Sequence, residues 1–226
     1  MNGKYTHLKK GNTLHIAILI CRRKHLLSSL MNYLGHALFS FNHNEVLVGN
    51  IIADFVKGRD QYNYPAGVQQ GIQLHRAIDA FTDAHPVMTS AKALFKPHYG
   101  LYAAVFTDVV WDYFLANDES LFTDASLMEF TGAVYQTLAQ HHQWLPPRFA
   151  AMLPFMQGQN WLYNYKYPQG IRSAFGGLVR RARYMTNHET AYEIFLEHMP
   201  RLQRLYNEFA PDVKFFAKAR YREIIG

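Results

Sequence analysis

The chain has 226 residues, of which 49% are hydrophobic and 18% are charged, and it contains one cysteine, Cys21. This composition excludes a disordered protein and a disulfide-stabilised one, and it is sufficient for a helical domain with a sizeable core. The formal charge of +6 arises in residues 1–30, which hold six of the 23 basic side chains and no acidic one, so residues 31–226 carry 17 of each sign. The charge therefore does not favour nucleic-acid binding, and the single cysteine fits a cytoplasmic protein.

Residues 1–30 form a basic N-terminal extension that we expect to lie outside the folded domain. The apolar piece Ile16–Cys21 is shorter than the roughly 20 residues that a membrane-spanning helix needs. Basic residues follow it and no cleavage site of small residues is present, which argues against a secretory signal. We therefore expect no membrane span, a natural start at Met31, and one domain over residues 31–226.

The first half of this domain predicts short helices separated by polar breaks. Apolar residues recur with helical spacing, and Pro65, Pro86 and Pro97 mark interruptions or helix starts. The expected elements are a short helix over 31–42, an apolar run over 46–60, a loop over 62–67, a helix over 71–85, a helix from Pro86 to about Phe95, a break at 96–98 and a buried helix over 101–115.

The second half is also helical in pattern, and we find no convincing alternating strand or internal repeat. We expect a helix over 125–142, another from Pro146–Pro147 to about Met156, a turn at 168–170, an arginine-bearing helix after it, and helical pattern from His188 with kinks or breaks at Pro200 and Pro211. The predicted fold class is all-α, a single-domain helical bundle.

Acidic and histidine side chains occupy positions in these helices that call for an explanation. On the helix over 71–85, His75, Asp79 and Asp83 follow one another at one-turn spacing, beside an apolar face. Asp108 and Asp112 lie one turn apart in a helix that is apolar nearly all round, where two like charges are costly without a positive partner. A metal ion, a histidine or an arginine could supply that charge.

Each of these residues also has an ordinary structural interpretation. His36 could be a hydrogen-bonded structural histidine, and Asp54 could pair with Lys57 or Arg59. An ion pair of Asp79 with Arg76 on one helix face would be unremarkable. For Asp83, capping of the helix that follows at Pro86 is a better interpretation than catalysis.

Considered together, the two histidines and several aspartates on separate helices match a set of metal ligands. Imidazole and carboxylate without thiolate favour Mn²⁺, Mg²⁺ or Fe²⁺ over a structural zinc. Arg76, beside the ligand positions, could clamp a phosphate. The sequence lacks a glycine-rich phosphate loop after a strand and a GxSxG motif, and its cysteine lies in the extension.

Five segments in their order along the chain resemble the acyl carrier protein phosphodiesterase family, which is regarded as a divergent, HD-domain-like branch of the helical phosphohydrolases. The segments read MNYLGHALFS, GNIIADFVKG, GIQLHRAIDAFTD, FTDVVWDYFL and WLYNYKYPQGIRSAFGGLVRRAR. The resemblance implies hydrolysis of the phosphodiester that joins 4′-phosphopantetheine to a serine of holo-acyl carrier protein. It also implies dependence on a divalent metal, typically Mn²⁺.

The resemblance also implies roles for individual residues. The HD-type doublet of adjacent His and Asp is replaced here by His75 and Asp79 at one-turn spacing. The expected metal ligands are His36, Asp54, His75, Asp79 and Asp108. The expected catalytic residues are Asp54, Asp112 and Arg76, which would orient a water, accept its proton or offset phosphate charge.

Aromatic and basic residues are the candidates for binding the substrate. The aromatic run from Trp161 to Tyr167 could line a slot for the pantetheine arm, and it could equally be core. A basic face would suit an acidic carrier protein, although a solvated helix face is as good an interpretation. The expected substrate-binding residues are Lys57, Arg59, Trp161, Tyr165, Arg172, Arg180 and Arg181.

Two other functions remain open from the sequence. One is an HD-like phosphohydrolase acting on a nucleotide or another small phosphodiester. The other is a helical protein that binds carrier proteins without catalysis, for which removal of metal would leave binding intact. The sequence gives no prediction of the oligomeric state.

Overall fold

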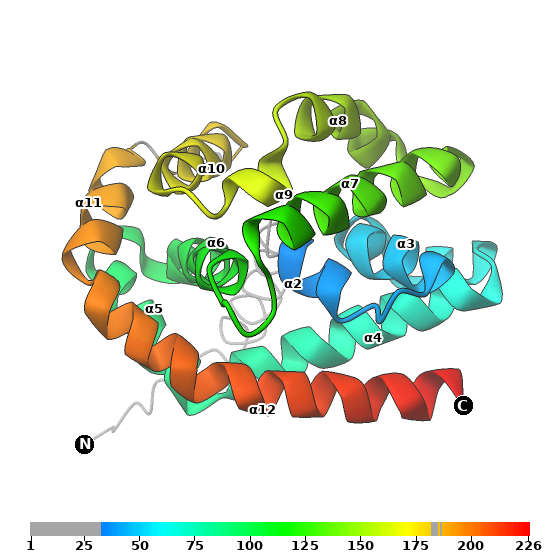
Figure 1. Ribbon diagram of the computed structural model, residues 1–226, viewed down its shortest axis with the longest axis horizontal. Helices are drawn as coiled ribbons and strands as arrows, with labels where there is room; N and C mark the ends of the chain where they lie inside the picture. Colours follow the sequence, from blue (N-terminus) through cyan, green and yellow to red (C-terminus); the bar gives the residue numbers. More distant parts are fainter. Residues whose placement is uncertain (1–32, 182–184, 186) are drawn as a thin grey trace, which may run out of the picture.

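Helix α6 (Ala103–Ala116) runs through the middle of the molecule and organises the helices around it (Figure 1). The computed structural model describes residues 33–181, 185 and 187–226, so the predicted extension over 1–30 lies outside the described part. Helix α6 buries side chains on all its faces and packs against α2, α5, α10 and α12. The sequence prediction of a buried helix here is confirmed.

The other helices surround α6, and the described residues contain no strand, which confirms the all-α prediction. In chain order they are α2 (Tyr33–Leu38), α3 (Asn44–Ile52), α4 (Ala66–Ala84), α5 (Pro86–Tyr99), α7 (Asp124–Gln140), α8 (Pro147–Gly158), α9 (Trp161–Asn164), α10 (Pro168–Arg181), α11 (Glu189–Glu197) and α12 (Met199–Ile225). Short 3₁₀ turns follow α3 (Ala53–Phe55 and Gly58–Asn63), precede α6 (Gly100–Tyr102) and follow α7 (His142–Trp144).

Helices α3 and α4 approach each other at backbone distance because glycines meet at their crossing. A Cβ atom on Gly49 would lie 2.0 Å from the carbonyl oxygen of Val68, and one on Gly71 would lie 2.2 Å from that of Val46. Only glycine permits so close an approach. The crossing brings the polar residues that follow Gly49 on α3 beside those that follow Gly71 on α4.

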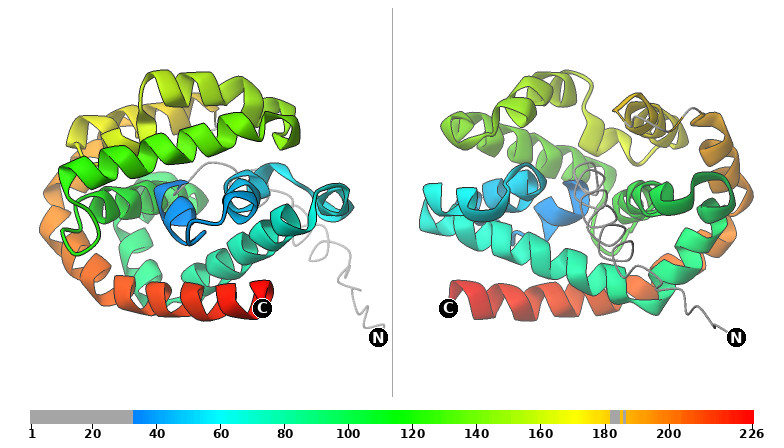
Figure 2. Two further views of the ribbon diagram at one scale, coloured as in Figure 1. Left: turned by 45° about the vertical axis from the view of Figure 1, so that its right-hand side comes forward. Right: turned by 180° about the vertical axis from the view of Figure 1, so that it is seen from behind.

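The long helix α12 closes one side of the molecule. The C-terminal half of α12 runs along α4 (Figures 1 and 2). Phe81 of α4 stacks on Phe216 of α12, with ring centroids 4.4 Å apart, and also faces Phe209. Helices α7 and α8 lie on the opposite side of the molecule from α12 (Figure 1). No helix in the described part of the chain combines the length and hydrophobicity that crossing a bilayer requires.

The structure corrects the interruptions expected at Pro97 and Pro168 and excludes a break at Pro211. Helix α5 passes through Pro97 and ends at Tyr99, so the expected break at 96–98 is wrong. Pro168 is the first residue of α10 rather than part of a turn, because a proline at that position has no helical hydrogen bond to lose. Helix α12 is continuous through Pro211, and burial of Phe209 and Val213 beside it offsets the lost backbone bond.

Candidate metal centre and the adjoining cavity

Four side chains from three segments converge beside the crossing of α3 and α4. They are His36 of α2, Asp54 of the turn after α3, and His75 and Asp79 of α4. The Nε2 atom of His36 lies 3.2 Å from one oxygen of Asp79, and the Nε2 atom of His75 lies 3.1 Å from the other. Asp54 approaches the same Nε2 atom of His75 to 3.4 Å. The two imidazole rings are stacked, with centroids 3.9 Å apart.

A single buried residue, Asn50, fixes the orientation of both rings. Its side-chain NH₂ donates to the carbonyl oxygen of His36 at 2.8 Å and to the Ser40 hydroxyl at 3.1 Å, so its side-chain oxygen faces His36 Nδ1 at 2.7 Å. Its backbone carbonyl lies 2.7 Å from His75 Nδ1. Because both oxygens can only accept, both Nδ1 atoms carry the hydrogen. The lone pairs of the neutral rings therefore reside on the Nε2 atoms.

This arrangement fits a bound cation. Neither Nε2 atom makes a hydrogen bond within the described part of the chain, and both are buried. Their lone pairs face the carboxylate of Asp79, an arrangement that is repulsive unless a positive charge lies between them. His36, His75 and Asp79 offer ligand atoms that all lie within 4.8 Å of one another. Asn50 supplies the second hydrogen bond that metal-binding histidines typically make.

The local charges show the same preference for a cation. Burial alone would lower the pKa of His75, but the carboxylates of Asp79 and Asp54 outweigh it and raise that pKa well above its usual value. Burial and the nearby His75 lower the pKa of His36. Burial alone would raise the pKa of Asp79, but His75 and His36 hold it well below its usual range. The carboxylates thus favour a positive charge at His75 Nε2, carried by a proton or by a metal ion.

The two aspartates of α6 occupy different surroundings. Burial, together with the charge of Asp79, raises the pKa of Asp108 well above its usual value, so Asp108 lies within electrostatic reach of the centre. Asp112 accepts hydrogen bonds from the backbone N–H groups of Leu34 and Gly35, at 3.1 and 2.9 Å. Its partner is the N-terminus of α2, and burial raises its pKa to about 7. The catalytic role expected for Asp112 stays a prediction.

Three expected basic residues are exposed on the segments that also carry centre residues. Arg76 is exposed on α4 and donates to the Gln61 side chain at 2.6 Å and to the carbonyl oxygen of Val56 at 3.2 Å. Lys57 and Arg59 are exposed after Asp54, Lys57 directly before the turn Gly58–Asn63 and Arg59 within it. The roles expected for these three residues stay predictions.

The structure decides between some of the interpretations that the sequence leaves open. Asp79 pairs with the two histidines, while the guanidinium of Arg76 binds Gln61 and Val56. The interpretation of Asp83 as a helix cap is wrong. Asp83 pairs with Lys92 at 2.7 Å, and His85 caps α5 by accepting from the backbone N–H of Val87.

A cavity of about 740 Å³ lies between α6, α9 and α10, and none of the four residues of the centre lines it. Its walls contain the predicted substrate-binding residues Trp161, Tyr165, Arg172 and Arg180, whereas the side chain of Arg181 lies outside the described part of the chain. Arg172 pairs with Glu189 at 2.9 Å and lies over the ring of Tyr192. The structure thus brings four of the expected substrate residues together and places Lys57 and Arg59 elsewhere, in the segment that follows Asp54.

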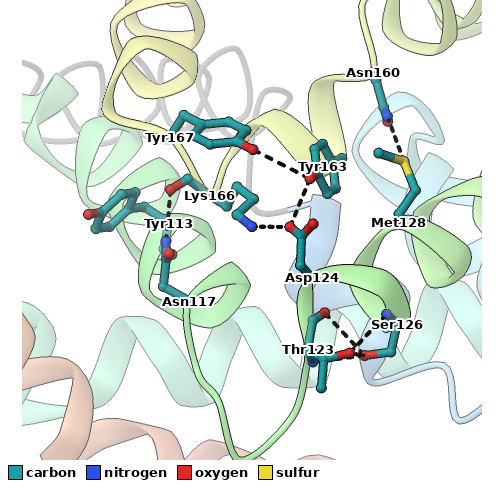
Figure 3. Close-up of polar contacts among 10 residues, drawn as sticks. All are labelled: Tyr113, Asn117, Thr123, Asp124, Ser126, Met128, Asn160, Tyr163, Lys166 and Tyr167. Carbon is teal, nitrogen blue, oxygen red and sulfur yellow. Dashed lines mark hydrogen bonds and ion pairs between the residues drawn. The ribbon is translucent and has the colours of Figure 1, made fainter.

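Polar contacts fasten the aromatic segment that walls this cavity (Figure 3). The Tyr163 hydroxyl donates to Asp124 at 2.8 Å, and Lys166 pairs with the same carboxylate. Asn117, after the end of α6, donates to the carbonyl oxygen of Lys166 at 3.0 Å. Tyr163 is therefore directed toward the start of α7, while Trp161, Asn164 and Tyr165 line the cavity.

Sequence reasoning did not select Asn50 as a site residue. The available signal was an amide in an apolar run, one turn before Asp54. Such an amide is costly to bury unless each of its groups finds a partner, as they do here.

The comparisons with known proteins identify the family of this chain. Residues 31–213 match the family model described as acyl carrier protein phosphodiesterase. Relatives with that name include proteins of Photorhabdus laumondii (31% identical, covering 80% of this chain and 92% of the relative), Enterobacter sp. (30%, covering 83% and 98%) and Yersinia pestis (27%, covering 86% and 100%). No solved structure was found to match. The chain belongs to the acyl carrier protein phosphodiesterase family.

Proposed function

We propose that this chain is a metal-dependent phosphodiesterase that releases 4′-phosphopantetheine from holo-acyl carrier protein and leaves apo-acyl carrier protein. Family membership supports the reaction and the substrate. The observation that carries the metal dependence is the pair of buried Nε2 atoms, on His36 and His75, whose lone pairs face one carboxylate. A cytoplasmic location stays a prediction.

The proposed ligands are His36, His75 and Asp79, with Asp54 and Asp108 as further carboxylates for the same ion or a second one. Nitrogen and oxygen donors without sulfur favour Mn²⁺, with Mg²⁺ or Fe²⁺ as alternatives. A bound divalent ion would lower the pKa of water and offset charge on the phosphate oxygens.

The protein side chains have complementary tasks in the hydrolysis. A water oxygen bonds to phosphorus as the bond from phosphorus to the serine oxygen breaks, and the serine oxygen takes up a proton. Asp54 is only 12% exposed and borders the centre, so it is placed to orient the water or accept its proton. Arg76, exposed on α4 next to His75 in the sequence, would turn from Gln61 to the phosphate and offset its charge.

The test is the mass of holo-acyl carrier protein incubated with the chain and Mn²⁺, with and without EDTA. We expect the phosphopantetheine mass to disappear only when metal is present. A folded His75→Ala variant should lose this activity by at least about 100-fold, whereas His142→Ala, at an exposed position outside the centre, should retain it. Equal loss of mass with EDTA would overturn the metal dependence, and no loss at all would overturn the substrate.

A further inference from the structure

The cavity between α6, α9 and α10 has the size and position of a binding site for an elongated group. Its volume of about 740 Å³ is within the range of small-molecule sites. Tyr33 in its wall lies one turn before His36 on α2, and Val109 directly follows Asp108 on α6. The cavity thus borders α2, which carries His36 of the centre, and α6, which carries the proposed further ligand Asp108.

The uncharged part of this cavity's lining matches a chain that carries amide groups, while Arg172, Arg180 and Glu189 add charges to the wall. Aromatic side chains from α9 and the residues after it, among them Trp161, Tyr165 and Tyr167, provide apolar faces. The amide side chains of Gln159 and Asn164, together with other uncharged polar groups, provide hydrogen-bond donors and acceptors. A chain of amide, hydroxyl and methyl groups can use both kinds of wall, whereas its phosphate would remain at the metal centre.

The structure of α9 and α10 keeps this space open. Asp124 holds Tyr163 and Lys166 on the side of the segment near α7 (Figure 3). At the corner between α9 and α10, a Cβ atom on Gly170 would lie 1.9 Å from the carbonyl oxygen of Asn164, so the corner is closed as tightly as a glycine allows. Because this wall is already ordered before the ligand binds, less of the binding free energy is lost in ordering it.

We propose that this cavity binds the pantetheine arm of the substrate and thereby confers specificity for pantetheine-bearing phosphodiesters. The proposal rests on the proposed function, since it names the cavity that receives the group which that reaction removes. Ser173, exposed on α10 and part of the cavity wall, offers a position from which to fill the space.

The test combines direct binding with turnover. Pantetheine, which lacks the phosphate, should bind the wild-type chain in calorimetry with or without EDTA. Ser173→Trp should abolish that binding and lower kcat/KM for holo-acyl carrier protein by at least about tenfold, while its affinity for Mn²⁺ stays as in the wild type. Ala133→Trp, at an exposed position on α7 outside the cavity, is the matched control and should behave as the wild type.

The outcomes separate this inference from the proposed function. If the wild type cleaves holo-acyl carrier protein but does not bind pantetheine, the cavity is not the binding site of the pantetheine arm, and the enzyme assignment stands. Unchanged kcat/KM in folded Ser173→Trp overturns the inference in the same way. If the wild type does not cleave holo-acyl carrier protein at all, the proposed function fails and the arm site fails with it.

Discussion

Asn50 is the residue through which the two histidines of the centre act as a pair. Its side-chain oxygen holds the His36 ring and its backbone carbonyl holds the His75 ring, so one residue sets the tautomer of both. Substitution of the side chain removes only the first of these bonds. The His36 ring should therefore lose its fixed orientation, while the His75 ring keeps its own.

We predict that Asn50→Ala weakens Mn²⁺ binding by about 10- to 100-fold, because the His36 ring loses the bond that directs its Nε2 atom. Calorimetric titration of the folded variant with Mn²⁺ measures this. Ser40→Ala is the control, since it removes a neighbour of Asn50 without touching the bond to the His36 ring. Equal Mn²⁺ affinity in Asn50→Ala and Ser40→Ala would contradict a positioning role for Asn50.

Asp112 should make the stability of the fold depend on pH. Burial raises its pKa to about 7 in the folded chain, against about 3.9 when unfolded. The folded state therefore binds this proton more tightly, and the free energy of unfolding should fall as the pH rises from about 4 to about 7. The full effect is on the order of 2–4 kcal/mol.

Urea unfolding of wild type and Asp112→Asn in EDTA, at about pH 5 and about pH 8, isolates this contribution. The variant cannot ionise at this position, so it should lose less stability than the wild type between the two pH values. An equal decrease in the free energy of unfolding in both proteins would show that Asp112 does not cause the pH dependence. A loss of turnover in Asp112→Asn at unchanged stability would instead favour the catalytic role expected for it.

At the scale of elements, the close crossing of α3 and α4 builds the centre. Gly49 and Gly71 let the two backbones touch, and residues that follow each glycine then face one another. Asn50 and Asp54 reach His75 in this way. If α3 and α4 were farther apart by the size of one methyl group, the Asp54 carboxylate would be separated from the His75 imidazole.

We predict that Gly71→Ala destabilises the fold by about 1–3 kcal/mol and weakens Mn²⁺ binding, because its Cβ atom would collide with the carbonyl oxygen of Val46. Gly132→Ala on α7 is the matched control. A Cβ atom there meets nothing within 4 Å, so this change should stabilise its helix by up to about 1 kcal/mol. Thermal unfolding and Mn²⁺ titration measure both effects, and similar values for the two variants would refute the role of the crossing.

The sequence predicts the helices from their apolar spacing, and spacing along one helix also predicts that His75 and Asp79 lie together. His36 and Asp54, on other segments, are expected from the family resemblance. His75 and Asp79 share a face because they are one turn apart. Buried aspartates need partners because a charge that leaves water without one is costly. The partner that Asp112 finds is the N-terminus of α2, a contact between distant segments that no local pattern encodes. The same holds for Asn50, whose value lies in its contacts with His36 and His75.

At the scale of the whole molecule, two sets of exposed cations are candidates for meeting an acidic partner. Lys57, Arg59 and Arg76 lie on the segments that carry Asp54 and His75, and Arg172 and Arg180 line the cavity. Acyl carrier proteins are acidic, so either group could attract one during the approach of the substrate. Because Arg172 is already paired with Glu189, Arg180 is the better position at which to test the second group.

We predict that Arg180→Glu raises KM for holo-acyl carrier protein by about tenfold and lowers kcat by less, because a docking charge acts before the chemical step. Arg204→Glu on α12 makes the same change of charge outside the cavity and should leave both constants near those of the wild type. The increase in KM should shrink at high salt, since exposed charges are screened. If kcat falls while KM stays constant, Arg180 acts on the reaction itself; if both variants raise KM equally, only the net charge of the molecule matters.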